Sequence, residues 1–297
     1  MSDLEKKRIA TAETLSEALP YMKEFNGNTF VIKFGGNAMG DSDLTKSFSQ
    51  NIVLMKQVGI NPIVVHGGGP QIGNMLEKLD IETNFIDGLR VTDKITVEVV
   101  EMVLCGKINK EIVQSINNAG GTAVGISGKD SKLINAKRLT KKNYKSDSRI
   151  EKILDLGYVG EPNLINPYIL NIFEKSDIIP VIAPIGVGDD GETYNINADT
   201  VAGAIASSIK ATKLIILTDV KGVLDEKGDL IEEIDIKFAK ELMARNIFSE
   251  GMIPKIETCV SALNSGTEAV HILDGRIKNA MILEVFTEKG IGTKMVP

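Results

Sequence analysis

Short continuous apolar runs alternate with longer segments of helical periodicity along most of the chain. The runs are rich in Val, Ile, Leu and Ala and occupy positions 29–34, 61–65, 122–126, 178–183, 213–217 and 268–273. Continuous apolar runs are typical of strands buried on both faces, and the helical segments between them suit parallel crossover connections. The pattern predicts an α/β fold, a three-layer αβα sandwich with a mostly parallel central sheet. Ligands of such sheets bind at the carboxyl ends of the strands.

The first 28 residues follow a different pattern. Pro20 lies inside a segment with helical spacing of apolar residues, so the predicted helix should kink or break near Leu19. Because the segment precedes the first strand of an otherwise complete domain, it either packs on its own domain or serves as an oligomerisation arm. The periodicity leaves both alternatives open. The apolar positions are Ile9, Ala12, Leu15, Leu19 and Met22.

Two stretches, 84–93 and 153–164, carry glycines and charged residues inside otherwise β-like sequence. Both are predicted to be hairpins that lie over a cleft. The chain contains no internal repeat and no low-complexity linker, so a separate third domain is not expected.

Composition narrows the classes of function. A net charge of −6, without a stripe of clustered Lys and Arg, argues against a nucleic-acid surface. The first residues are polar and no apolar run is long enough to cross a bilayer, so a cytoplasmic location without membrane association is expected. Two isolated cysteines favour a reducing compartment, and two histidines are too few for a zinc site.

Glycines follow the ends of the first two predicted strands. Lys33 closes an apolar run, and a lysine there needs an anionic partner or an exposed end, although a surface lysine beside turn glycines is the commoner explanation of such a motif. Three consecutive glycines, 67–69, separate the second strand from a helix that Pro70 opens. One glycine would suffice for a tight turn. The triplet therefore favours a loop whose backbone N–H groups, with the helix dipole, bind an anion.

Polar residues gather where later strands end. Asn195, Asn197 and Asp199 alternate just before a predicted helix over 200–209, so they would face one side of an extended segment. Asn197 or Asp199 is expected to cap that helix, but capping does not require all three. The string TDVKGV at 218–223 ends another strand, and GMIPK at 251–255 opens another helix, which makes Lys255 a second candidate cation.

Two glycine motifs carry no function. Positions 186–191 match the GxGxxG fingerprint of a nicotinamide dehydrogenase, but the next helix begins several residues later and two aspartates would repel a pyrophosphate. Positions 125–130 lack both the spacing of a phosphate-binding P-loop and the hydroxyl residue after its lysine.

Six motifs in order make the sequence similar to the amino-acid kinase family over almost its whole length, and most similar to the members that act on N-acetyl-L-glutamate. They are VIKFGGNAM at 31–39, VVHGGGPQI at 64–72, GLRVTD at 88–93, YNINAD at 194–199, LTDVKGV at 217–223 and GMIPK at 251–255. The resemblance implies an amino-acid kinase domain over 29–297, with a substrate lobe at 29–179 and an ATP lobe at 180–297. The helix at 1–28 would be an appendage.

The resemblance also implies roles for single residues. Lys33 and Lys255 would flank the transferring phosphoryl group, with Asp199 orienting both. Arg90 would hold the α-carboxylate of N-acetyl-L-glutamate. The other implied contacts are Gly68, Gly69, Asn195 and Asn197 with the substrate, and Gly36, Thr218, Asp219 and Lys221 with ATP, whose phosphates would carry Mg²⁺ without a protein metal site.

The implied reaction, ATP-dependent phosphorylation of a γ-carboxylate in arginine biosynthesis, is chemically consistent with these residues. The attacking carboxylate is already ionised at neutral pH, so it needs no general base. Crowded phosphoryl and carboxylate oxygens instead need charge compensation and alignment. Lysines, glycine N–H groups and Mg²⁺ would supply this charge compensation and alignment. Other family members, acting on glutamate or an aminoadipate derivative, and a non-catalytic arginine sensor are the alternatives.

Two further features come from the resemblance. The N-terminal helix and the string 271–293 resemble members that arginine inhibits, which are hexamers built from dimers through interlaced helices, and this favours the arm. The corresponding effector residues are His271, Glu284, Glu288 and Gly290. One position departs from the pattern, because Glu250 stands where a glycine is expected before Gly251.

Overall fold

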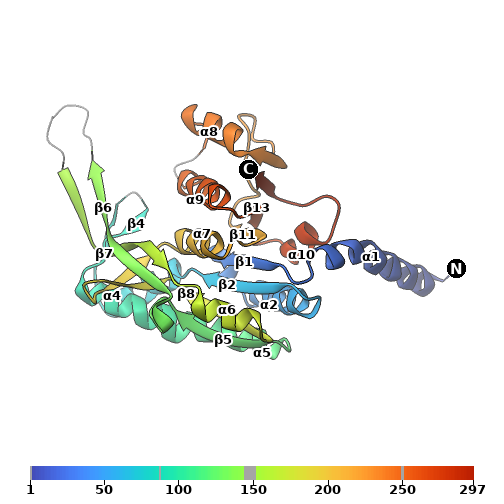
Figure 1. Cartoon of the computed structure of the whole chain (residues 1–297), viewed down its shortest axis with the longest axis horizontal. Coiled ribbons are helices and arrows are strands. Elements are labelled where there is room, and N and C mark those ends of the chain that lie inside the picture. The colour runs from blue at the N-terminus through green and yellow to red at the C-terminus, as the bar shows by residue number, and fades with distance from the viewer. Residues whose placement is uncertain (1, 87, 144–151, 249–250) are drawn as a thin grey trace.

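An eight-stranded sheet runs through the centre of the computed structural model, which describes residues 2–86, 88–143, 152–248 and 251–297 (Figure 1). Its strands are β1 (Thr29–Phe34), β2 (Asn61–His66), β5 (Thr122–Ser127), β8 (Ile178–Ala183), β11 (Lys213–Thr218), β12 (Glu233–Asp235), β13 (Ala269–Asp274) and β14 (Thr293–Val296). The spatial order is β12-β14-β13-β11-β1-β2-β8-β5. All neighbouring strands are parallel except β13 and β14. This confirms the predicted α/β fold, and the six predicted strands match to within one residue at each end.

Two smaller sheets lie beside the central one. β6 (Ile134–Asn143), β7 (Lys152–Ile165), β9 (Ile185–Gly188) and β10 (Thr193–Ile196) form a small closed barrel, and β3 (Phe85–Ile86) pairs with β4 (Leu89–Arg90). The hairpin predicted at 84–93 is therefore present. The hairpin predicted at 153–164 is wrong, because this stretch is one strand, β7, antiparallel to β6. Its glycine at 157 lies at an irregularity in the β6–β7 pairing rather than at a turn.

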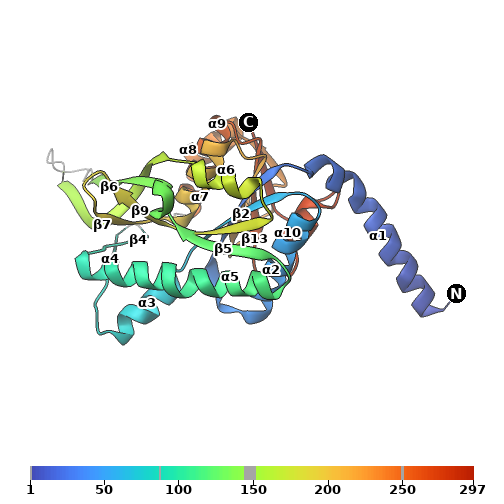
Figure 2. The same cartoon turned by 60° about the horizontal axis from the view of Figure 1, so that its bottom comes forward.

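Helices cover both faces of the central sheet. Figure 2 shows α2, α4 and α5 on one side and α6, α7 and α9 on the other. A π-helical segment, η2, joins α4 to α5, so the three form one long rod. The helices are α1 (Asp3–Phe25), α2 (Ser42–Gln57), α3 (Gly69–Lys78), α4 (Lys94–Glu101), η2 (Met102–Ile108), α5 (Asn109–Asn118), α6 (Tyr168–Glu174), α7 (Ala198–Ile209), α8 (Ile236–Ala244), α9 (Ile253–Asn264) and α10 (Ala280–Val285), with short 3₁₀ turns η1 (Gly36–Gly40) and η3 (Asp130–Lys132).

The alternation of side chains along β1 decides what faces each helical layer. Phe30, Ile32 and Phe34 enter the core that includes α2, whereas Val31 enters the core that includes α7. Side chains of a strand alternate between its two faces, so Lys33 lies on the same face as Val31. The sequence of β1 thus directs Lys33 toward α7.

α1 extends away from the rest of the molecule (Figure 1). The helix continues through Pro20, so of the two predicted outcomes, a kink or a break, the break is absent. The kink near Leu19 stays a prediction. Most of its apolar stripe is exposed: Ile9 to 45%, Leu15 to 61% and Leu19 to 49%. Among the side chains of α1 that the structure describes, Ala18 and Phe25, toward the end of the helix, are the buried ones that join the core.

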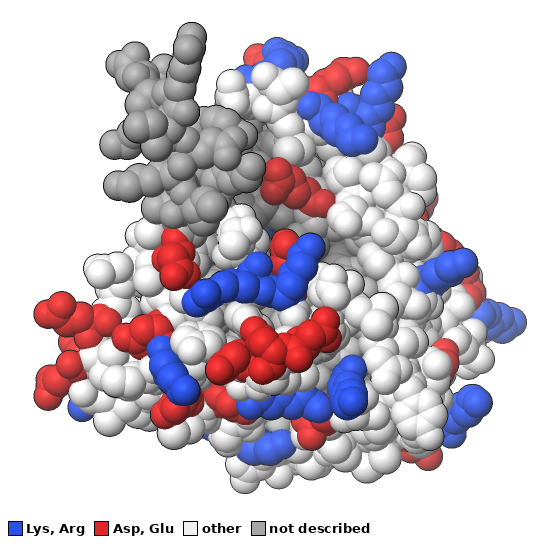
Figure 3. Space-filling view, turned by 60° about the vertical axis from the view of Figure 1, so that its left-hand side comes forward, with Lys and Arg blue, Asp and Glu red and all other residues white. Residues whose placement is uncertain are grey.

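The two predicted lobes share the central sheet. Residue 180, their predicted boundary, lies inside β8, and the division into a substrate lobe and an ATP lobe remains a prediction. Acidic and basic side chains are interspersed on the face shown in Figure 3. Within the described ranges, no helix is long and apolar enough to span a membrane.

Candidate active site

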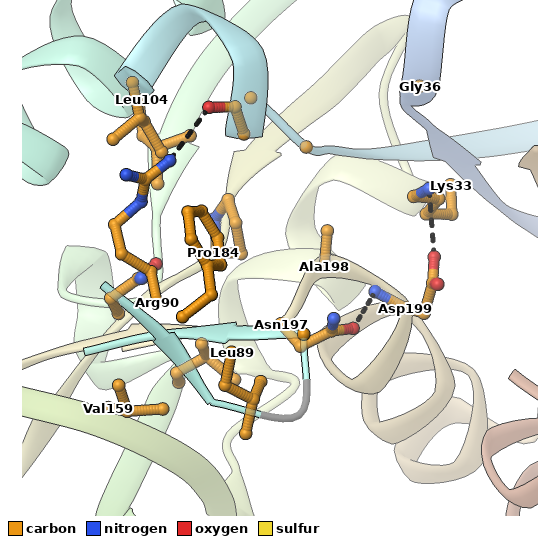
Figure 4. Close-up of a pocket in the computed structure, with 18 of the residues that line it drawn as sticks. Lys33, Gly36, Leu89, Arg90, Leu104, Val159, Pro184, Asn197, Ala198 and Asp199 are labelled. Carbon is orange, nitrogen blue, oxygen red and sulfur yellow. Dashed lines mark hydrogen bonds and ion pairs between the residues drawn. The ribbon is translucent and has the colours of Figure 1, made fainter. Parts of the chain in front are cut away.

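A cleft of about 290 Å³ opens where β1, β2 and β10 end. Figure 4 shows Arg90 on one side of it and Lys33 with Asp199 on the other. The charged residues that line it are three cations and one carboxylate: Lys33, Arg90, Lys255 and Asp199. The volume suits a small molecule, and the excess of positive charge favours an anionic one.

Asp199 lies between the two lysines. Its Oδ1 is 3.0 Å from Lys33 Nζ, and its Oδ2 accepts a hydrogen bond from Lys255 Nζ. Lys33 Nζ also donates to the backbone oxygen of Leu217, at 3.4 Å. Burial alone would raise the pKa of Asp199, but the two ammonium groups outweigh it and hold the pKa below its ordinary value. Asp199 is therefore a stable carboxylate that fixes both cations.

The position of each member follows from its element. Asn197 caps α7, and Asp199 lies in the first turn of that helix, where a negative charge is favourable. Lys255 lies in the first turn of α9, where the helix dipole disfavours a cation, so its placement needs the carboxylate of Asp199. The two helices approach closely at Gly203, where a Cβ would stand 2.5 Å from the Cγ2 methyl of Thr258.

Arg90 is buried without a carboxylate partner among the described residues. It is 8% exposed, its Nη1 donates to Thr83 Oγ1 at 2.8 Å, and its Nη2 donates to the carbonyl of Gly69 at 3.2 Å. The guanidinium lies over the ring of Phe85, 4.5 Å from its centroid. Burial lowers the pKa of Arg90 from its usual range. An uncompensated buried cation is costly, so this site is suited to an anionic ligand.

The glycine loop forms the N-terminus of α3. Gly68 is its N-cap and Pro70 stands in the first turn, as predicted. A Cβ at Gly68 would collide with Ile108 and Leu104 of η2, whereas a Cβ at Gly69 would meet open space. Packing therefore requires the glycine at 68. Packing does not require a glycine at position 69, and the open space beside Gly69 could hold part of a ligand.

The polar string before α7 is divided between two elements. Asn195 lies in β10, and Asn197 is the helix cap, whose Oδ1 accepts from the backbone N–H groups of Asp199 and Thr200. The string is thus extended only as far as Asn197. Asn195, Asn197 and Asp199 nevertheless all line the cleft.

The residues expected to hold ATP follow the neighbouring strand, β11. Thr218 ends β11 and is buried, and Lys221 is exposed. Gly36 has a φ of +72°, and a Cβ there would stand 2.5 Å from a carboxylate oxygen of Asp219, so only glycine fits beside that side chain. Of this group only Gly36 lines the cleft; the other three lie beyond its lining, toward the end of β11.

Comparison with known proteins gives the same family over most of the chain. Residues 28–274 match the model of the amino acid kinase family. The chain belongs to the amino acid kinase family. The acetylglutamate kinase of Rhodospirillum rubrum is 60% identical over 282 residues, which cover 95% of this chain and 91% of that protein. That of Rhodospirillum centenum is 59% identical over 285 residues, covering 96% and 93%. These identities place the chain with the acetylglutamate kinases.

Two solved structures share the fold. N-acetylglutamate synthase from Neisseria gonorrhoeae superposes with a TM-score of 0.83 at 23% identity, over 96% of this chain and 63% of that one. Carbamate kinase from Giardia lamblia gives 0.62 at 16% identity, over 91% and 98%. At such identities the likeness concerns the amino acid kinase fold alone.

The expected effector residues of this kinase lie apart from the cleft lining. His271 Nδ1 is 2.6 Å from Glu284 Oε1, and Glu284 Oε2 accepts from the backbone N–H of Ile291. Burial lowers the pKa of His271 and outweighs the opposing effect of Glu284. A Cβ at Gly290 would strike the carboxylate of Glu284. Three of the four residues are thus together, while Glu288 is exposed and has no hydrogen bond or ion pair to them in the described chain.

Sequence reasoning missed several residues of these sites. Phe85 is the direct cross-strand partner of Arg90, which the predicted hairpin could have revealed. Leu104 reaches the cleft from η2, and no sequence signal indicated a π-helix there. Lys213 Nζ lies 3.2 Å from His271 Nε2 and 4.8 Å from the ring centroid of Phe25, so it links the effector group to α1.

The two glycine motifs that were rejected as binding sites have structural roles. Positions 186–191 run from β9 into the turn before β10. Positions 125–130 run from β5 into a 3₁₀ turn, where Asp130 accepts from the backbone N–H of Ser127. Glu250 lies outside the described residues.

Proposed function

We propose that this chain transfers the γ-phosphoryl group of ATP to the γ-carboxylate of N-acetyl-L-glutamate, giving N-acetyl-L-glutamyl 5-phosphate and ADP in the second step of arginine biosynthesis. The support is the pair of acetylglutamate kinases to which the chain is about 60% identical over nearly its full length. The cleft is the site of the reaction, and its work is carried out in the reducing environment of the cytoplasm, where the two cysteines are free thiols.

The observation that carries the proposal is the separation of two cationic groups by one small cleft (Figure 4). The acceptor is a dianion with an α-carboxylate and a γ-carboxylate. Arg90 pairs with the α-carboxylate through its planar guanidinium, which replaces the missing anionic partner of this buried cation. The γ-carboxylate then reaches the lysines on the opposite side of the cleft.

The lysines and the glycine loop act on the transferring group. Lys33 and Lys255, held by Asp199, neutralise charge on the phosphoryl oxygens as the bond to ADP breaks and the bond to the carboxylate forms. N–H groups of Gly36, Gly68 and Gly69 donate to the same oxygens. The γ-carboxylate attacks as an anion and releases no proton, so no residue has to act as a base.

Residues 195 and 197 complete the acceptor site. Asn197 uses its oxygen to cap α7, which leaves its amide nitrogen to face the acetylated substrate. Asn195 contributes beside it from β10. These contacts distinguish the acetamido group of the substrate from a free amine.

ATP binds at the end of β11 through Thr218, Asp219 and Lys221. Mg²⁺ bound to its phosphates would neutralise their charge. The described residues offer no group of three or more His, Cys, Asp or Glu side chains able to hold a metal.

Regulation by arginine and assembly into a hexamer belong to the same proposal. The exposed apolar stripe of α1 is covered in a trimer of dimers, and Lys213 connects the end of α1 to His271 and Glu284. Arginine binding there favours the open cleft over the closed one, which lowers activity.

A coupled assay of ADP formation tests the proposed reaction. N-acetyl-L-glutamate, glutamate and N-acetyl-aminoadipate are offered as acceptors at equal concentration. The proposal predicts turnover with N-acetyl-L-glutamate and little with the others. Preference for glutamate would assign the chain another activity in the family, and no turnover with any acceptor would favour a non-catalytic arginine sensor.

A further inference from the structure

A buried chain of polar side chains lies directly beneath the glycine loop. His66 is the last residue of β2 and is fully buried, and Asn109, at the start of α5, is 1% exposed. Neither side chain lines the cleft, and the proposed reaction uses neither. Buried polar side chains need hydrogen-bond partners, so the partners of His66 and Asn109 indicate what these two residues do.

The orientation of the Asn109 amide is fixed by its neighbours. Its Oδ1 accepts from Lys110 Nζ at 3.0 Å, and its Nδ2 lies 2.9 Å from the backbone carbonyl oxygen of Val181 and 3.4 Å from that of Ile126. An ammonium can only donate and a carbonyl can only accept, so the amide cannot be reversed. Its NH₂ group therefore faces His66 Nε2, 3.3 Å away.

That orientation selects the tautomer of His66. Nε2 accepts from Asn109, so in the neutral ring the proton is on Nδ1. Nδ1 lies 2.8 Å from the carbonyl oxygen of Gly67 and donates to it. Burial, opposed by the hydrogen bond to Gly67 and aided by the nearby Lys110 ammonium, lowers the pKa of His66 to about 4, so the ring is neutral at physiological pH.

The hydrogen bond from His66 fixes the peptide that links Gly67 to Gly68. Gly67 is held on both sides, because its N–H donates to the carbonyl of Phe34 at 2.8 Å. The described chain has no cis peptide, and in a trans peptide the C=O and the following N–H point in opposite directions. With its carbonyl turned toward His66, the peptide directs the N–H of Gly68 toward the cleft.

Two observations support this direction. Gly68 lines the cleft, and its N–H has no hydrogen-bond partner within the described part of the chain. A loop of three glycines has wide conformational freedom, so an unheld peptide could rotate and remove this donor. We propose that His66 and Asn109 are positioning residues that hold the Gly67–Gly68 peptide with its N–H toward the reacting oxygens. The inference rests on the proposed phosphoryl transfer.

Two substitutions at one position separate this role from simple packing. In His66→Asn the amide nitrogen is as far from Cα along the side chain as Nδ1 and can still donate to Gly67. In His66→Gln the side-chain amide reaches the position of Nε2 and keeps the contact with Asn109. It can no longer donate a hydrogen bond to the carbonyl of Gly67. We expect kcat of His66→Gln to be on the order of tenfold or more below that of His66→Asn, with the KM for ATP changed less than about twofold.

A merely structural role gives a different result. Both variants would then lose activity equally and in proportion to their loss of thermal stability, which would overturn the inference. Melting temperatures of both variants are measured beside the kinetics. Turnover by the wild-type protein is measured first, so that failure of the proposed function is recognised separately.

Nitrogen-15 NMR of the wild-type histidines decides the tautomer without any variant. The chain has only two histidines, so assignment needs a single His271 substitution. We expect His66 to be protonated at Nδ1, unprotonated at Nε2 and still neutral at about pH 5. A ring protonated at Nε2 would overturn the inference whichever acceptor the enzyme uses.

Discussion

Asp199 Oδ1 lies 3.0 Å from Lys33 Nζ, although the first residue opens a helix and the second lies near the end of a strand far earlier in the chain. The contact exists because Lys33 shares the face of β1 on which α7 packs. Asp199 binds Lys255 of α9 through its other oxygen. One buried carboxylate thus holds two cations, and the proposed chemistry depends on them.

Removing either lysine should stop most of the turnover. Lys33→Ala or Lys255→Ala removes a preorganised positive charge from the phosphoryl site, so we expect kcat to fall about a hundredfold or more while the KM for the acceptor changes much less. Steady-state ADP formation measures both. Lys237→Ala, on the exposed face of α8, is the matched control. Near-normal turnover in either cleft variant would reject the assignment.

Arg90→Lys should mainly weaken acceptor binding. The substitution keeps the charge but loses the planar pair of donors, so the KM for N-acetyl-L-glutamate should rise about tenfold with the KM for ATP nearly unchanged. Arg245→Lys, at the exposed end of α8, controls for a general loss of arginine. If ATP binding weakened instead, Arg90 would belong to the nucleotide site.

Gly203 should control the distance between α7 and α9. Gly203→Ala adds a Cβ that would stand 2.5 Å from Thr258 Cγ2, which forces the helices apart and disturbs the Asp199–Lys255 contact. We expect kcat to fall about tenfold, on the scale of one misplaced catalytic contact. Thr258→Ser removes the opposing methyl, so the double variant should recover most of the activity. Equal activity of the single and double variants would contradict this packing argument.

The exposed stripe of α1 should be an assembly surface. Leu15→Glu with Leu19→Glu should leave an active dimer with a weakened response to arginine, and deletion of residues 1–24 should do the same. Both leucines are about half exposed or more in the single chain, so the substitutions should not destabilise its fold. Light scattering and an arginine titration measure the outcome, with Leu79→Glu as an exposed control. A variant that stayed hexameric would show that α1 has another role.

Stability should fall on mild acidification because both histidines are buried. The pKa of His66 is about 4 in the folded chain, against about 6.5 when unfolded, so its contribution is complete above pH 6.5 and is lost as the pH falls toward 4. The pKa of His271 is also lowered and acts in the same direction. Urea midpoints at pH 7 and pH 5 should therefore differ less for His66→Asn than for the wild-type protein. An unchanged difference would contradict a neutral buried His66.

The sequence predicted the elements that carry strong local signals. The six buried strands are continuous apolar runs. The N-cap at Asn197 follows from local hydrogen bonding, and Pro70 in the first turn of α3 follows from backbone geometry. The sequence does not predict the short strands β12 and β14, because their structure depends on long-range pairing. β14 pairs with β13, and β12 pairs with β14. The glycines of the stretch 153–164 are typical of turns and predict a hairpin, yet Gly157 lies at an irregularity in the pairing of β7 with β6.

The site was predicted as residue types rather than as contacts. Lys33, Asp199 and Lys255 could be named from their positions at the ends of strands and the starts of helices, but the close approach of α7 and α9 depends on one glycine opposite one methyl group. Long-range packing of this kind leaves no periodicity in the sequence. The tautomer of His66 is likewise set by Asn109, a residue with no local signal.

The most direct test of the account is to trap the product. An acyl phosphate reacts with hydroxylamine to give a hydroxamate and inorganic phosphate, so the enzyme is incubated with ATP, Mg²⁺, N-acetyl-L-glutamate and hydroxylamine while ADP is measured in parallel. The account predicts one hydroxamate for each ADP, with both lost in Lys33→Ala. ADP formed without hydroxamate would mean that the phosphoryl group is not transferred to the γ-carboxylate, which would contradict the proposed reaction.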